Sequence, residues 1–107
     1  MENDSRRSPR YPFYASAEIT ELQTKTGLTA RTSELSRHGC YMDMMNPFPL
    51  ATKVKIHITH QNEDFEATGS VVYAQPNIGM GVSFEASQPK DDATLEKWLE
   101  ELKSKQE

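Results

Sequence analysis

The sequence contains a single cysteine, Cys40, among its 107 residues. One cysteine excludes an internal disulfide and suits a protein of a reducing compartment. No apolar run approaches the roughly 18 residues that a membrane-spanning helix needs. Residues 1–5 also lack the basic-then-apolar order of a signal peptide. We therefore expect a cytoplasmic protein without a membrane span.

The residue sets that catalysis and metal binding require are missing as well. No glycine-rich phosphate loop of the Walker or dinucleotide kind occurs. Ser36 and His38 have neither a third catalytic partner nor an oxyanion motif. His57 and His60 point to opposite faces of a strand, and His38 with Cys40 supplies only two ligands. We expect no enzyme activity, no metal and no cofactor.

Basic charge is scarce overall but unevenly distributed. The net charge of −4 disfavours DNA or RNA as a partner, including single strands. All five arginines lie within residues 1–37, whereas the rest of the chain carries six lysines against eleven acidic residues. Arginine binds phosphates and guanine edges through a planar fork. This segregation indicates an anionic ligand near the first third of the chain.

Apolar and polar side chains alternate with a period of two, which is typical of half-buried strands. Turn residues at 24–27, 61–64 and 76–77 and a proline-containing loop at 46–49 separate the segments. Gly69 predicts a bulge or bend. The regular spacing favours a closed barrel or a sandwich of short antiparallel strands. The six segments are residues 11–20, 28–32, 40–44, 53–58, 65–73 and 78–84.

The last part of the chain has the pattern of an amphipathic helix. Its apolar residues recur at the spacing i, i+3, i+4 and i+7. Acidic residues suit its start as caps and basic residues suit its end. We therefore predict one mostly-β domain, a six-stranded antiparallel β-barrel with a C-terminal α-helix that buries Trp98. The helix residues in question are Leu95, Trp98, Leu99 and Leu102, with Asp91, Asp92, Lys103 and Lys105 at the ends.

Two polar stretches are candidate ligand sites. The sequence Arg6-Arg7-Ser8-Pro9-Arg10 is either a solvated tail or an arm that orders on a ligand. In the turn of residues 34–39, Glu34 and Ser36 either satisfy the local backbone or hold an anion or a base edge together with Arg37. Gly39 allows a positive φ and a close approach of the backbone to a ligand.

Together the two stretches resemble the PilZ domain family, receptors for the bacterial second messenger cyclic di-GMP. Arg6-x-x-x-Arg10 is followed, about two dozen residues later, by the acid-x-Ser-x-x-Gly turn that ends at Gly39. Residues 70–73 and 79–84 look like the closing strands of the family. The barrel followed by a helix matches its architecture, so the resemblance covers nearly the whole chain.

The resemblance implies roles for individual residues. Arg6 and Arg10 match the paired arginines that bind phosphates and the Hoogsteen edges of guanine, and Arg7 adds a phosphate contact or stacks on a base. Ser36 and Gly39 match the residues of the turn.

Tyr73 lies where some members place an aromatic ring against guanine. Its strand phase equally allows a place in the core. Glu34 departs from the usual Asp or Asn, and its extra methylene moves the carboxylate by about one bond. The acceptor therefore either still reaches guanine N1 and N2 or is misplaced.

The predicted function is that of a cyclic di-GMP receptor. Residues 1–10 form a flexible ligand-binding arm, and residues 11–104 form the barrel and helix. Ligand binding orders the arm and signals to a protein partner that the sequence does not identify. The alternative is an interaction adaptor of the same fold that does not bind the nucleotide and uses the helix surface or a methionine-rich strand with Met42, Met44 and Met45.

Overall fold

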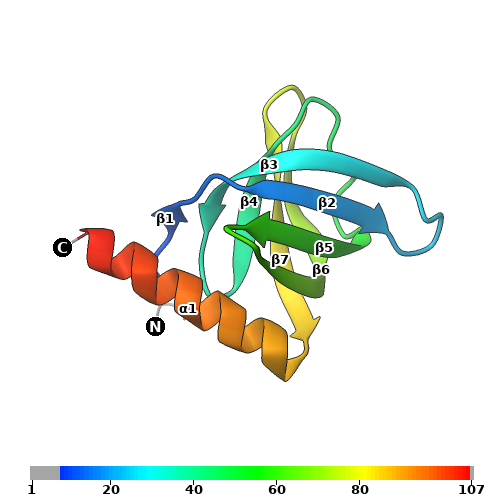
Figure 1. The fold of residues 1–107 in the computed structure, drawn as a ribbon. Helices are drawn as coiled ribbons and strands as arrows, with labels where there is room; N and C mark the ends of the chain where they lie inside the picture. The colour runs from blue at the N-terminus through cyan, green and yellow to red at the C-terminus, as the bar shows by residue number, and fades with distance from the viewer. Residues whose placement is uncertain (1–7, 107) are drawn as a thin grey trace, which may run out of the picture.

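The computed structural model describes residues 8–106, and Arg6 and Arg7 lie outside the described residues. Every paired strand is antiparallel, and the order β1-β3-β2-β5-β6-β7-β4 is closed into a barrel by pairing of β3 with β4 (Figure 1). The short β1 lies beside β3 in line with β2. The predicted six-stranded barrel with a C-terminal helix is confirmed. The elements are β1 (Tyr11–Pro12), β2 (Ser16–Glu21), β3 (Gly27–Leu35), β4 (Gly39–Asp43), β5 (Lys53–His60), β6 (Glu63–Gln75), β7 (Gly79–Ser87) and α1 (Pro89–Gln106).

The first predicted strand, residues 11–20, is interrupted between β1 and β2. The cause is the fully buried side chain of Thr32 in β3. Its hydroxyl donates to the carbonyl oxygen of Phe13 at 2.7 Å and accepts the Ala15 N–H at 3.0 Å. The Thr32 hydroxyl thus takes the place of a backbone partner for the segment between β1 and β2. The predicted alternation survives, because Phe13, Ala15 and the inward residues of β2 are all buried.

Inward side chains from all six barrel strands fill the interior, and α1 runs across one end of the barrel (Figure 1). Trp98 of α1 is 1% exposed, which confirms its predicted burial. Its ring centroid lies 5.3 Å from that of Phe13 and 6.4 Å from that of Phe65. The indole N–H donates to the carboxylate of Glu63 at 3.3 Å. The helix therefore closes the core at this end.

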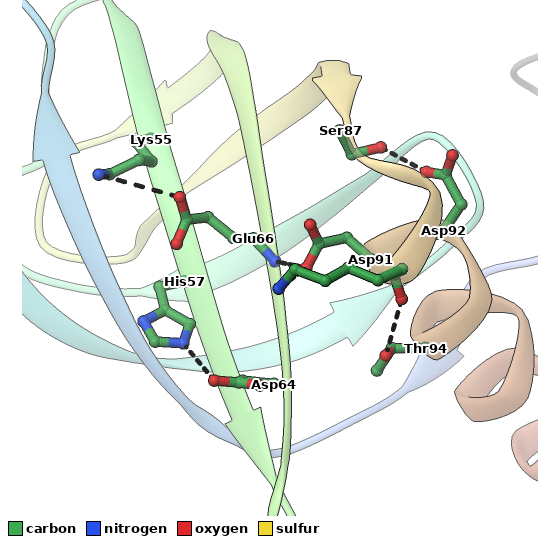
Figure 2. Close-up of polar contacts among 9 residues, drawn as sticks. Lys55, His57, Asp64, Glu66, Ser87, Asp91, Asp92 and Thr94 are labelled. Atoms are coloured by element: carbon green, nitrogen blue, oxygen red, sulfur yellow. Dashed lines mark hydrogen bonds and ion pairs between the residues drawn. The ribbon is translucent and has the colours of Figure 1, made fainter.

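The start of α1 differs from the prediction. The helix begins at Pro89, so Asp91 and Asp92 lie within its first turn instead of capping it. Buried Asp91 accepts the backbone N–H of Glu66 at 3.0 Å, and Asp92 accepts the hydroxyl of Ser87 (Figure 2). Both acids still face the positive end of the helix dipole. Through these contacts they join α1 to β6 and β7.

The pairing of β6 with β7 is irregular at two places. Near Gly69, where a bulge is predicted, the register shifts because Glu85 of β7 has no opposite residue. A second shift leaves Val72 as the extra residue of β6. The prediction that Ile78 belongs to the last strand is wrong, because Ile78 lies exposed in the turn before β7. Among the described residues, no helix has the length and apolar character to cross a membrane.

Candidate functional site

An open pocket of about 580 Å³ lies on the surface of the barrel, over the end of β3, the start of β4, the first half of β7 and the bulged part of β6. All the predicted site residues that the structure describes line it, namely Arg10, Glu34, Ser36, Gly39 and Tyr73. Its other lining residues are not among the ligand contacts predicted from the sequence. These are Leu35, His38, Cys40, Tyr41, Val72, Gly81, Val82 and Ser83.

Four of the lining residues form a row across four neighbouring strands. Glu34 of β3 is paired with Tyr41 of β4, Tyr41 with Gly81 of β7, and Gly81 with Tyr73 of β6. The ring centroids of the two tyrosines are 6.2 Å apart and the rings are tilted by 54°. The row thus combines one carboxylate with two aromatic rings.

Tyr73 reaches this surface because of the extra residue Val72 in β6. Up to Val71 the strand alternates in phase with buried Phe65, and continuation of this phase would place Tyr73 in the core. The extra residue reverses the phase, so Tyr73 is 52% exposed. The bulge decides between the core and surface positions that the sequence left open.

The turn after β3 is held by its own hydrogen bonds. The Ser36 N–H donates to the carbonyl oxygen of Gly39 at 2.9 Å. The Ser36 hydroxyl accepts the His38 N–H and donates to the Gly39 carbonyl, both at 3.3 Å. Ser36 therefore shapes the turn, as one of the two readings of the sequence expected.

Gly39 does not use the positive φ that glycine allows, since no described glycine has one. A Cβ at Gly39 would instead overlap the carbonyl oxygen of Val82 in β7. Position 39 needs glycine because β4 and β7 pack closely there. The close approach that the glycine allows is therefore to the backbone of β7.

Arg37 does not contribute to the pocket, although the sequence offered it as an anion-binding fork. Its guanidinium forms an ion pair with Glu96 of α1, on the side away from the pocket. The hydrogen bond from Arg37 lowers the pKa of the Glu96 carboxyl, and the same bond raises the pKa of Arg37. Arg37 thus ties the turn to α1, whereas Ser36, His38 and Gly39 of the same turn line the pocket.

The pocket holds a charged group of each sign, on Arg10 and Glu34. Within residues 8–105, neither Arg10 nor Glu34 forms an ion pair. Cys40 lies beneath the pocket, and burial raises the pKa of its thiol to about 12, so it remains protonated. No group of three or more potential metal ligands is brought together in the described part of the chain.

The family model and similar solved structures indicate one family. The PilZ domain model matches residues 4–101. The PilZ domain of CeSA from a cellulose-synthesizing bacterium superimposes with a TM-score of 0.71 at 19% identity, covering 90% of this chain and 99% of that one. The PilZ domain with c-di-GMP of YcgR from Escherichia coli gives a TM-score of 0.72 at 15% identity, with coverages of 95% and 94%.

A third similar structure is the inhibitor of motility MotI/DgrA from Bacillus subtilis. Its TM-score is 0.69 at 13% identity, and the match covers 92% of this chain but 50% of that protein. No curated protein sequence matches the chain. The family match extends over the barrel and most of the helix, so this chain belongs to the PilZ domain family.

Proposed function

We propose that this chain is a bacterial cytoplasmic receptor for cyclic di-GMP. The observation that carries the proposal is the pocket itself. It gathers Arg10, Glu34, Ser36, Gly39 and Tyr73, which are separated by up to 63 positions in the sequence. The YcgR domain to which the chain is similar in fold has been solved with c-di-GMP. No step requires catalysis, a cofactor or a metal.

The chemistry of the pocket matches that of the ligand. Cyclic di-GMP carries two phosphates and two guanines. The Arg10 guanidinium donates in the planar geometry that suits phosphate oxygens and guanine O6 and N7. The Glu34 carboxylate accepts from guanine N1 and N2, and the exposed Tyr73 ring offers a stacking face. Ser36 and Gly39 shape the turn that follows Glu34.

The arm of residues 1–10 completes this proposal. Pro12 is paired with Glu34 and Tyr11 with Leu35, so the same register continued by one residue runs Arg10 alongside Ser36. The arm therefore starts at the edge of the pocket. We propose that Arg6 and Arg7 join Arg10 on the ligand and that the arm becomes ordered there. A protein partner then binds the ordered arm. Residues 11–104 act as the scaffold.

Isothermal titration with cyclic di-GMP tests the proposal. Wild-type protein should bind saturably, and the stoichiometry gives the number of ligands per chain. Arg10→Ala should bind at least about tenfold more weakly, because it removes charge-assisted bonds worth roughly 1.5–3 kcal/mol. Arg31→Ala is the matched control, since Arg31 bonds Asp43 at 2.8 Å and does not line the pocket. Equal binding by Arg10→Ala and wild type would exclude the arm as a ligand clamp.

A second candidate function is an adaptor that does not bind the nucleotide. Two observations favour it, the Glu34 departure from the family pattern and the 62% exposure of Met45 in an uncharged loop. Met42 is fully buried in the core, so the proposed methionine surface reduces to Met45 and half-buried Met44. If wild type is silent in titration and Glu34→Asp binds, the receptor proposal fails for this chain and the adaptor remains.

A further inference from the structure

Tyr41 lies at the centre of the pocket row, and its outward direction follows from the strand. Its neighbours Cys40 and Met42 are 6% and 0% exposed and point into the core. Residues on either side of an inward position point outward in a strand, so Tyr41 faces the pocket. Its cross-strand neighbours are Glu34 on one side and Gly81 on the other.

The ring of Tyr41 is fixed in place. Its hydroxyl donates to the side-chain oxygen of Gln75 at 2.8 Å. The ring covers Gly79, where a Cβ would lie only 2.6 Å from the ring atom Cε2 and 2.8 Å from the hydroxyl oxygen. Burial, followed by the nearby Tyr73, Asp43 and Glu34, raises the pKa of Tyr41, so the hydroxyl remains a donor. A fixed ring loses little conformational entropy when a ligand binds.

The two tyrosine rings form the sides of a trough with Gly81 at its base. A Cβ at Gly81 would lie 3.2 Å from Cβ of Tyr73 and 3.6 Å from Cδ1 of Tyr41. Sandwiching a base between parallel rings takes two contact distances of about 3.5 Å each. The rings are 6.2 Å apart and tilted by 54°, so the trough is too narrow for a sandwich. The two rings contact each other at this distance. A base can therefore approach only from the open pocket, where it would stack on one ring and touch the other with its edge.

We propose that Tyr41 is a second aromatic contact for the ligand, and that Tyr41 and Tyr73 together receive one guanine base. The inference rests on the proposed cyclic di-GMP function. Glu34 and Tyr41 are direct cross-strand neighbours, so a base that extends from the Tyr41 ring toward β3 would meet the Glu34 carboxylate. The same row thus supplies stacking and an acceptor for the Watson–Crick edge of guanine.

Three variants separate a ligand contact from a purely structural role. Tyr41→Phe keeps the ring and loses the Gln75 bond, and it should bind within about threefold of wild type. Tyr41→Leu keeps an apolar cover over the glycines and loses the stacking face. It should bind about 5- to 150-fold more weakly, the range expected for loss of base stacking. Tyr14→Leu, at a 60% exposed tyrosine outside the pocket, is the control and should leave binding unchanged.

The measurements are titration of each variant with cyclic di-GMP and NMR of the tyrosine ring protons in wild type. Stacking should shift the Tyr41 ring protons upfield at saturation, and the edge contact should also move those of Tyr73. If wild type does not bind, the proposed function fails and the inference fails with it. If wild type binds but Tyr41→Leu binds equally well, only the inference is overturned. Should Tyr41→Leu fail to fold, unmoved Tyr41 ring protons in saturated wild type would overturn it instead.

Discussion

Gly39 and Gly27 both lie in strands, but only Gly27 has room for a Cβ atom. A Cβ at Gly39 would overlap the Val82 carbonyl, whereas at Gly27 the nearest atom would lie at 3.7 Å. We expect Gly39→Ala to lower the free energy of unfolding by about 1–3 kcal/mol through overpacking. Gly27→Ala should raise it by up to about 1 kcal/mol, because alanine restricts the unfolded chain. Urea unfolding measures both, and equal effects would contradict the packing explanation.

The thiol of Cys40 should be unreactive while the barrel is folded. Burial raises its pKa to about 12, so the reactive thiolate is scarce at pH 8. We expect a disulfide reagent to label native protein at pH 8 far more slowly than protein unfolded in urea. Labelling of native protein at the rate of a free exposed thiol would show that the end of β4 opens readily. Bound ligand should slow the labelling further, because Cys40 lies beneath the pocket.

At the scale of elements, α1 is attached to the barrel by apolar burial more than by charge. Trp98 is 1% exposed and packs against Phe13 and Phe65, whereas Arg37 and Glu96 are about half exposed. Exposed ion pairs contribute little to stability, because water and salt screen them. We expect Trp98→Ala to destabilise the protein by about 3–5 kcal/mol. Arg37→Ala should leave the urea midpoint nearly unchanged.

The control for the helix prediction is Trp98→Phe, which retains most of the buried area and loses the bond to Glu63. Its cost should fall well below that of Trp98→Ala. If Arg37→Ala destabilised the protein as much as Trp98→Ala, the ion pair and not the indole would hold the helix. Circular dichroism of both variants distinguishes detachment of α1 from loss of the whole barrel.

The elements could be predicted from the sequence because each depends on a local pattern. Period-two alternation marks the barrel strands, and the stripe containing Trp98 marks the helix. The site was predicted only in part. Tyr73 changes face because of an extra residue at Val72, and such a bulge depends on the partner strand β7. Arg37 turns away because Glu96, 59 positions later, lies beside it. The outward direction of Tyr41 could have been predicted from the sequence, since it alternates with buried Cys40 and Met42.

At the scale of the whole molecule, three glutamates link stability to pH. The pKa values of Glu63, Glu85 and Glu96 are lowered from the ordinary 4.5. The main causes are hydrogen bonds from Lys97 to Glu63, from Ser70 and then Lys53 to Glu85, and from Arg37 to Glu96. These bonds join segments distant in sequence, β6 to α1, β5 and β6 to β7, and the turn after β3 to α1.

A carboxyl whose pKa is lower in the folded than in the unfolded state stabilises the fold above its ordinary pKa, and this contribution disappears as the pH falls through the folded value. The urea midpoint should therefore be flat from pH 7 to about 5.5 and decline once the pH drops below about 4.5. Replacing Glu63, Glu85 and Glu96 together by glutamine should lower the midpoint at pH 7 only slightly, because each exposed pair contributes little, and should reduce its decline in acid.

The control is Glu101→Gln. It removes one negative charge, as each of the three substitutions does, but among the described residues Glu101 forms no hydrogen bond to the barrel. An unchanged acid slope in the triple variant would assign the decline to other carboxyls. Because the three pairs are exposed, added salt should also reduce the slope in wild type.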